Sequence, residues 1–385
     1  SGQLTALVTP GGGRWEFGYN SRHLLVSEKD PGGRTKTHTH DGNGNVLSTI
    51  DERSFTTKFE YNDDNERTAI VYHNSARVDI ARDPLTGMPT SIVDAVVTVN
   101  RGYDELDRLV TESIPLLSRN LAMEYDKNSN RIALVVNGAR TEYTFDALNR
   151  QKTLSHASGA QASWDYDPIG LVTRKSLPNG ITLDQTYSDR KLTQMAYKTS
   201  GGTPIQTINY THDSLANILS MTDNEGQQTY SYDAQNRLTN VAYPAGSSLF
   251  SEEFGYSTSG NRVSRQFFDQ ATGLHQESIS YDTSDRILQI TDTAVVTRVF
   301  GHDAAGNLTT DWNVTANTTT THTYDVRNRL VSTAVPGVGV VNQEYFPNSP
   351  LRLWFTDTSG VTQTRQLWDP VTQNPLQDLD SANAL

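Results

Sequence analysis

Apolar and polar residues alternate along much of the chain in runs of about six residues. In one such run Trp15, Phe17 and Tyr19 share one parity, while Glu16 and Gly18 take the other. Alternation with a period of two is typical of a β-strand that has one apolar face. No stretch sustains a helical period or helix caps over ten residues. The pattern therefore predicts an all-β chain.

Most of these predicted strands end in the same short signature. An aromatic residue is followed by Asp, and Asn, Asp or Gly comes three or four residues after that Asp. Clean copies begin at Tyr103-Asp104, Phe145-Asp146, Tyr232-Asp233 and Tyr324-Asp325. The signature occurs fifteen times, and between residues 19 and 187 it returns about every 21 residues. A fixed period in this range indicates a repeat architecture.

We call the first position of the signature the anchor, and we expect anchors and turn aspartates to have structural roles. Arg82 occupies the anchor position of one copy. The predicted structural anchors are Tyr19, His40, Tyr61, Tyr103, Tyr125, Phe145, Tyr166, Tyr187, His212, Tyr232, Tyr256, Tyr281, His302 and Tyr324. The predicted turn aspartates are Asp41, Asp104, Asp126, Asp146, Asp167, Asp213, Asp233, Asp282, Asp303 and Asp325.

Each repeat contains two predicted turns. The first, which we call the signature turn, starts at the residue after the anchor, because Asp, Asn and Ser side chains bond to nearby backbone N–H groups. The second turn follows about 12 or 13 residues after the anchor, as at Pro31-Gly32-Gly33 and Asn137-Gly138. Two turns leave two strands of ordinary length in each repeat. The repeats at 187–212 and 256–281 are longer, and we expect their extra residues at the second turn.

Consecutive hairpins of this kind predict one continuous antiparallel sheet that coils into a shell or tube. We expect anchor rings to stack on one another in a ladder, because side chains of neighbouring strands lie about 5 Å apart. We also expect the Asp of one turn to meet an Arg of the adjacent turn, at positions such as Arg108 and Arg150.

Composition narrows the class of protein. The chain has 385 residues, a net charge of −12 and no Cys, and its mean hydropathy is −0.56. The acidic balance argues against a nucleic-acid partner, which would need clustered Lys and Arg. The lack of Cys excludes disulfides and thiolate metal sites. No apolar stretch approaches the roughly 18 residues of a membrane span.

The repeats predict a single region over residues 1–385 that is a piece of a larger protein. Clear repeats cover residues 15–345, degenerate repeats cover 346–370, and a tail covers 371–385. Both Ser1–Pro10 and Thr356–Trp368 carry few charges, so we expect open strand edges there. Such edges predict pairing with further repeats of the same protein or with identical chains.

The signature Tyr-Asp-x-x-Asn-Arg-Leu at a period of about 21 residues resembles the YD repeat of Rhs proteins, toxin-complex C subunits and teneurins. The resemblance extends from about Trp15 to Trp368. It implies a β-sheet that spirals into a hollow shell. In the bacterial members the shell encloses a toxic C-terminal polypeptide, and in teneurins it is extracellular and adhesive.

One part of the bacterial pattern is absent. Those proteins often end the shell with an Asp-Pro-x-Gly element used for self-cleavage. Here the nearest strings are Trp368-Asp369-Pro370 and Asp83-Pro84-Leu85-Thr86-Gly87, and neither has the required spacing. No cleavage residues are therefore carried over from the family.

Candidate sites compete with simpler explanations. His38 and His40 lie on one face of a predicted strand and resemble half of a metal site, but His40 is also an anchor. A catalytic carboxylate pair for glycoside hydrolysis would have to break the repeat pattern, whereas the turn aspartates are part of that pattern. Exposed aromatic residues also suit surface glycans. The sequence predicts no catalytic residue, metal or cofactor. Sequons for N-glycosylation begin at Asn209, Asn307, Asn313 and Asn317.

Two non-enzymatic functions remain open. In the first, the chain is a structural segment of a large secreted or cell-surface protein, forming the wall of a shell or fibre. In the second, it is part of a shell that encapsulates a toxic cargo. Because no cleavage element is present, the sequence favours the first. Both predict an extracellular or cell-surface location.

Overall fold

The computed structural model describes residues 2–360, 362–380 and 382–383. These residues form 35 β-strands and one short 3₁₀ helix, η1 (Pro115–Leu117). None of the described residues forms a helix long and apolar enough to span a membrane. The first strands are β1 (Ala6–Val8), β2 (Arg14–Tyr19), β3 (Leu25–Lys29), β4 (Thr35–His40), β5 (Val46–Ile50), β6 (Thr56–Tyr61), β7 (Arg67–Val71), β8 (Arg77–Arg82), β9 (Pro89–Val93), β10 (Thr98–Tyr103), β11 (Leu109–Ile114) and β12 (Arg119–Tyr125).

The strand pattern continues without a helix to the C-terminal end of the described chain. The middle strands are β13 (Arg131–Val136), β14 (Ala139–Phe145), β15 (Gln151–His156), β16 (Gln161–Tyr166), β17 (Val172–Ser176), β18 (Thr182–Ser188), β19 (Lys191–Lys198), β20 (Pro204–His212), β21 (Ile218–Asp223), β22 (Gly226–Tyr232), β23 (Leu238–Ala242) and β24 (Leu249–Tyr256). The last are β25 (Arg262–Asp269), β26 (Gly273–Tyr281), β27 (Ile287–Asp292), β28 (Val295–His302), β29 (Leu308–Asn313), β30 (Thr318–Tyr324), β31 (Leu330–Val335), β32 (Gly339–Tyr345), β33 (Arg352–Thr356), β34 (Gln363–Trp368) and β35 (Pro375–Leu379).

Each strand pairs antiparallel with the next one along the chain. The register shifts by one residue at the anchors, as where Gly102 pairs with Thr111 but Tyr103 pairs with Leu109. The same shift recurs at Tyr125 and at Phe145. This repeated β-bulge comes from the signature turn, which adds a left-handed residue to one side of each hairpin. The predicted all-β fold of consecutive antiparallel hairpins is confirmed.

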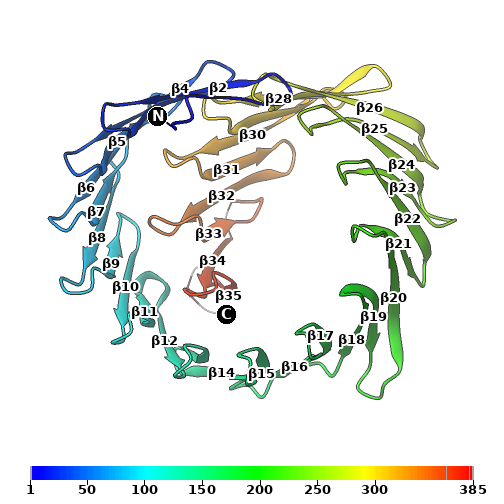
Figure 1. The fold of residues 1–385 in the computed structure, drawn as a ribbon, viewed down its shortest axis with the longest axis horizontal. Helices are drawn as coiled ribbons and strands as arrows, with labels where there is room; N and C mark the ends of the chain where they lie inside the picture. Colours follow the sequence, from blue (N-terminus) through cyan, green and yellow to red (C-terminus); the bar gives the residue numbers. More distant parts are fainter. Residues whose placement is uncertain (1, 361, 381, 384–385) are drawn as a thin grey trace.

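The sheet curves round into a ring, and its last strands turn inside that ring (Figure 1). From β2 to β28 the strands follow the circumference, whereas β30 to β35 run inward, so that the last strand, β35, lies inside. Side chains of β33, β34 and β35 pack on those of β10 to β13, so the inner strands contact the wall. The predicted coiled sheet is thus a spiral whose end is enclosed by its beginning.

The anchors lie on the inward face of the sheet. Val99, Met123 and Leu134 pack against Leu353 and Leu367 of the inner strands. Alternation along β10 and β12 gives Val99 the parity of anchor Tyr103 and Met123 that of anchor Tyr125. The same bulge recurs in most hairpins, so equivalent positions face the same side of the sheet in each of them. The anchors of successive hairpins therefore all face inward.

The outward face carries short polar residues together with exposed ion pairs, such as that of Glu124 with Arg140. The position before the anchor often holds Thr or Ser, and the hydroxyls of Thr144 and Thr153 on paired strands are 2.6 Å apart. At Gly102 a Cβ would lie 2.5 Å from Thr111 Oγ1, so a larger residue there would require the Thr111 hydroxyl to rotate away. Aromatic residues therefore face inward and short polar residues face outward over much of the ring.

Three details differ from the sequence prediction. In the long repeats the extra residues lengthen the strands, β19 and β20 having 8 and 9 residues. The second turn between them keeps the usual five-residue closure, with Thr199 N donating to Thr203 O at 2.9 Å. The segment Thr356–Trp368 is not an open edge, since it contains strand β34, which pairs on both sides. A strand, β35, also lies within the segment expected to be a tail.

Candidate functional site: the turn edges and the contact between the two windings

The signature turn is built around its first side chain. In the turn after Tyr103, Asp104 Oδ1 accepts hydrogen bonds from the backbone N–H groups of Leu106 and Arg108, each at 3.0 Å. Asp107 between them has a φ of 58°, a left-handed conformation that Asp and Asn tolerate. The backbone also closes the turn, with Asp104 N donating to Arg108 O at 3.0 Å.

The other turn aspartates make the same bonds. Asp41, Asp126, Asp146, Asp167, Asp213, Asp233, Asp282 and Asp325 each accept the N–H groups two and four residues later, and Asp303 accepts the N–H four residues later. A sequence signature thus becomes a row of identical turns along one edge of the sheet.

The charged residue that ends the turn pairs within that turn. Arg108 Nε donates to Asp104 Oδ2 at 2.8 Å, and this contact lowers the pKa of Asp104. The expected pairing of Asp with an Arg of the adjacent turn is therefore wrong. Arg108 reaches the next turn differently, through Nη1 donating to the backbone carbonyl of Asp126 at 3.0 Å. Five donors in a planar fork allow one Arg to serve both turns.

Where the turn ends in Asn, an amide replaces the guanidinium. Asn130 Nδ2 donates to Asp126 Oδ2 at 2.9 Å and to Asn149 Oδ1 of the next turn at 2.8 Å. The pKa of Asp126 is lowered, chiefly by the Asn130 bond. Both residue types therefore link each turn to the next along the edge.

The anchor hydroxyl bonds backward to the preceding repeat. Tyr125 OH donates to Leu109 O at 2.9 Å, and the Arg108 guanidinium lies 4.8 Å from the Tyr125 ring centroid. The same backward bond is made by Tyr19, Tyr61, Tyr103, Tyr166, Tyr187, Tyr232, Tyr256 and Tyr281. Phe145 and Tyr324 occupy the same position at the ends of β14 and β30.

Anchors do not stack ring on ring in the part of the chain that the structure describes. Anchors lie on every second strand, as Tyr103 on β10 and Tyr125 on β12 do, with β11 between them. The aromatic pairs that do form involve other residues, such as Phe55 with His73. An Arg guanidinium over the next anchor replaces the expected ring, because a cation is attracted to the face of an aromatic ring.

The histidine anchors share the inward position at the ends of β4, β20 and β28. Burial lowers the pKa of His302. His38 Nε2 lies 3.0 Å from Glu28 Oε1, and its Nδ1 lies 3.0 Å from Thr49 Oγ1. Among the described residues no group of three or more His, Asp or Glu side chains is arranged to hold a metal ion.

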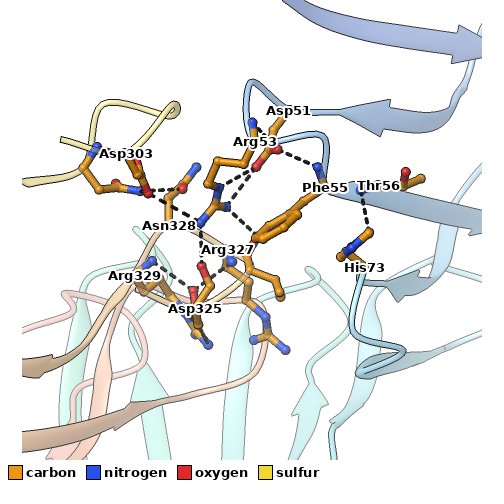
Figure 2. Close-up of polar contacts among 12 residues, drawn as sticks. Asp51, Arg53, Phe55, Thr56, His73, Asp303, Asp325, Arg327, Asn328 and Arg329 are labelled. Carbon is orange, nitrogen blue, oxygen red and sulfur yellow. Dashed lines mark hydrogen bonds and ion pairs between the residues drawn. The ribbon is translucent and has the colours of Figure 1, made fainter. Parts of the chain in front are cut away.

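A second set of contacts joins the start of the chain to its last third (Figure 2). Arg53, in the second turn between β5 and β6, donates to the backbone carbonyls of Asp325 and Val326 at 3.2 and 3.3 Å. Asp51 holds the same guanidinium at 2.9 Å. Asp325 starts the signature turn after β30. By this point the chain has passed once round the ring, and we call the first circuit the first winding and its overlapping continuation the second winding. At Arg53, a hairpin's second turn in the first winding therefore meets a signature turn of the second winding.

The same kind of contact occurs on either side of Arg53. Arg34 Nη2 donates to Ser284 Oγ at 3.0 Å. The Arg327 guanidinium lies 4.2 Å from the Tyr72 ring centroid. These partners are separated by roughly 250 residues of sequence, which is about the length of one winding. We call this row of turn-to-turn contacts the winding seam.

Farther inward, buried charges hold the last strands against the wall. Both oxygens of Asp369 accept bonds from Arg131, at 2.6 and 2.5 Å. Burial would raise the pKa of Asp369, but the bonds from Arg131 and from two backbone N–H groups outweigh burial and lower it. Asp369 follows Trp368 as a turn aspartate follows its anchor, since it accepts Val371 N at 2.9 Å and Thr372 N at 3.1 Å.

A pocket lies beside this ion pair. It has a volume of about 340 Å³ and is lined by Val99, Ile114, Trp368 and three prolines of the inner loops, among other residues. Glu112 also lines it and pairs with Arg101 at 2.9 Å. Burial raises the pKa of Glu112.

One cluster has the residue types of a hydrolase triad. Thr272 Oγ1 lies 2.7 Å from His275 Nε2, and His275 Nδ1 lies 2.5 Å from Asp292 Oδ2. Thr272 Oγ1 also donates to Asp269 at 2.9 Å, and the imidazole stacks on Phe267 with 4.6 Å between the ring centroids. The cluster closes the hairpin of β25 and β26.

Sequence reasoning missed several of these residues. Tyr345 and Trp368 act as further anchors, donating to Leu330 O and Arg352 O at 2.7 Å each. The sequence did carry a signal at Tyr345, which lies 21 residues after anchor Tyr324, and in the structure its ring lies under Arg329. The seam residues carried no such signal, because a contact across about 250 residues leaves no local pattern.

Comparison with known proteins agrees with this geometry. A family model described as RHS Repeat matches residues 1–35 and 212–248. These two segments therefore match the RHS repeat. Over 407 aligned residues it is 25% identical to the double-stranded DNA deaminase toxin A of Burkholderia cenocepacia strain H111, covering 93% of this chain and 27% of that protein.

Solved structures share the fold of this chain. A crystal structure of TcdB2-TccC3-Cdc42 matches with a TM-score of 0.61 and 11% identity, over 97% of this chain and 26% of that one. TcdB2-TccC3 without its hypervariable C-terminal region matches with a TM-score of 0.60, 11% identity, and 96% and 26% coverage. The chain thus spans about a quarter of the length of these proteins. The repeat and the shared fold support a structural scaffold.

Proposed function

We propose that the chain is a non-enzymatic wall segment of a hollow shell in a larger secreted protein, and that the shell encloses a polypeptide. The observation that carries the proposal is the inward direction of the anchor face. Half-buried aromatic residues such as Trp15, Trp164, Tyr197, Tyr230 and Phe254 lie on that face. An apolar, hydrogen-bonding lining suits a polypeptide that has not buried its own apolar residues.

The proposal assigns the repeated residues to the wall itself. Anchors bond backward to the preceding repeat, and turn aspartates hold the hairpin ends, so we propose structural roles for both sets. The similar toxin is named for a deaminase, and this chain matches 27% of it. We therefore propose that any toxic activity belongs to an enclosed part and not to the wall.

Protection of an attached segment tests the enclosure. An unstructured, protease-sensitive reporter is fused after Leu385, downstream of the inner strand β35, and in a matched control before Ser1. We expect trypsin to cleave the C-terminal reporter much more slowly than the N-terminal one. Equal cleavage at both ends would contradict the proposal.

The non-enzymatic part is tested at the Thr272 cluster. We expect hydrolysis of p-nitrophenyl acetate by the chain to equal that of the His275→Ala variant, because Thr272 is engaged by Asp269. Turnover that disappears in His275→Ala would overturn this part alone.

A fibre is the second candidate, and the first strand favours it. In and beside β1, Leu4, Leu7 and Val8 are 53%, 48% and 57% exposed. An apolar edge strand is a template for pairing with another chain. Electron microscopy separates the candidates, since discrete closed particles support the shell and strand-paired filaments support the fibre.

A further inference from the structure

The winding seam identifies which residue of a signature turn contacts a neighbouring layer. Where a signature turn meets the first winding, the residue two places after the turn-starting residue takes part in the contact, beside backbone contacts at the start of the turn such as those of Asp325 and Val326 with Arg53. Ser284 bonds Arg34, and Arg327 covers Tyr72. Ser259 lies so close to Gly11 that a Cβ at Gly11 would be 2.0 Å from its hydroxyl oxygen. This position, which we call the contact position, therefore faces whatever lies against the signature-turn edge.

In the first winding five contact positions hold exposed apolar side chains, with Asn128 between the second and third of them and Arg190 between the fourth and fifth. The residues are Leu85, Leu106, Leu148, Ile169 and Leu215, exposed at 93%, 67%, 67%, 60% and 68%. Each is two places after the turn aspartate and donates its N–H to that aspartate, so its side chain is held outside the turn. In the seam the same position is Ser259, Ser284, Ala305 or Arg327.

The opposite edge of the first winding is formed by the second turns, and over residues 137 to 247 these turns are small and mostly uncharged. Second turns in the seam carry Asp and Arg, as at Asp30, Arg34, Asp51 and Arg53. Second turns from residue 137 to 247 present small, mostly uncharged and exposed residues at their ends. These are Asn137-Gly138, Ser158-Gly159, Asn179-Gly180, Gly201-Gly202, Asn224-Glu225 and Ala245-Gly246.

The two edges also have the same spacing. Successive signature turns are two strands apart, and so are successive second turns. Neighbouring strands lie about 4.8 Å apart, so both edges repeat about every 10 Å. An apolar row on one edge therefore matches a row of small turns on the other, in the geometry that the seam already uses within the chain.

We propose that Leu85, Leu106, Leu148, Ile169 and Leu215 form a docking surface for a second copy of this chain, which offers its second turns from residue 137 to 247. The contact continues the established seam from one copy to the next. It is apolar, whereas the seam inside the chain relies on Arg, and it uses turns and not strand edges. Its arrangement is head-to-tail, because two different edges meet.

Sedimentation velocity over a concentration series tests the proposal on the intact chain. We expect reversible association that becomes about tenfold weaker or more in the triple variant Leu106→Ser, Leu148→Ser, Ile169→Ser. A matched control, Phe268→Ser with Leu274→Ser, removes exposed apolar residues from the outward face of β25 and β26 and should leave association unchanged. Circular dichroism and melting curves establish that each variant is folded.

A reciprocal variant tests the other edge. Ser158→Glu with Ala245→Glu places charge on the second turns and should weaken association of the otherwise unchanged chain. Addition of salt should not weaken the wild-type contact, since no charge pair carries it. A chain that stays monomeric at the highest concentration, association that survives the leucine variant, or association that salt abolishes would each overturn the proposal.

Discussion

Two parts of the wall are made from the same repeat but are stabilised differently. Residues 59–136 lie against the inner strands, and Val78, Leu117 and Leu134 are 0 to 2% exposed there. Tyr143 still packs against this core, but residues 146–256 have no such backing in the described chain, and their most buried apolar residues, such as Leu183, keep 5 to 8% exposure. The signature turns are nevertheless the same in both. Turn chemistry therefore builds the sheet, and a core forms only where a second layer covers it.

The largest expected effect is the loss of stability when the buried ion pair between the two layers is broken. Asp369→Asn leaves Arg131 buried without its charged partner, and loss of one member of a buried pair costs about 3–5 kcal/mol. We expect urea unfolding to show this loss, with earlier proteolysis of the last strands. Glu124→Gln is the control, because the exposed pair with Arg140 should contribute little. A similar small loss in both variants would show that the layers are not held by this pair.

The next effect concerns packing between the layers. Leu353 is fully buried, and Leu353→Ala should cost about 2–5 kcal/mol of unfolding free energy. Leu183→Ala in the single-layer wall should cost clearly less, since Leu183 packs within one sheet. Denaturant titrations of the two variants measure the difference directly. Equal losses would mean that the single sheet is as well packed as the double one.

These two regions also show what the sequence can predict. The alternation at Trp15, Phe17 and Tyr19 and the repeated Tyr-Asp turn predict the strands, their order and the turn chemistry, because these depend on residues within one repeat. The sequence does not predict that Arg53 meets Asp325, or that Arg131 meets Asp369. Those partners are 272 and 238 residues apart, and their meeting depends on how far each hairpin bends the sheet.

The anchors were predictable from the sequence only in part. The inward position of the anchors follows from alternation, but their contacts do not. A regular ladder of rings was the simplest expectation, and it failed because the second strand of each hairpin separates consecutive anchors. The Arg that ends each signature turn fills the gap, as Arg108 does at Tyr125.

A third variant pair removes the turn aspartate in each region. Asp104→Ala and Asp146→Ala each lose two backbone hydrogen bonds and one Arg contact, so each should lower stability less than Leu353→Ala and more than loss of one hydroxyl. The two losses should be equal, because the turns are equal.

Acid should reduce this third effect. The bonds to Arg150 and to the backbone lower the pKa of Asp146 from its ordinary value of 3.8. A carboxyl whose pKa is lower in the folded state contributes fully above its ordinary pKa, and the contribution disappears as the pH falls through the folded-state pKa. The gap between wild type and Asp146→Ala in thermal melts should therefore narrow below about pH 4. A constant gap would show that the charge of Asp146 contributes nothing.

The smallest expected effect tests whether the anchors work without a second layer. Tyr125 OH donates to Leu109 O at 2.9 Å under the inner strands, and Tyr187 OH donates to Val172 O at 3.0 Å in the single-layer wall. Tyr125→Phe and Tyr187→Phe each remove one hydrogen bond and should cost about 0.5–1.5 kcal/mol. Because both bonds join one repeat to the one before it, we expect equal losses in denaturant titrations. A larger loss at Tyr125 would mean that the inner strands strengthen the anchor bond, and the two regions would then differ in their repeat contacts as well as in their packing.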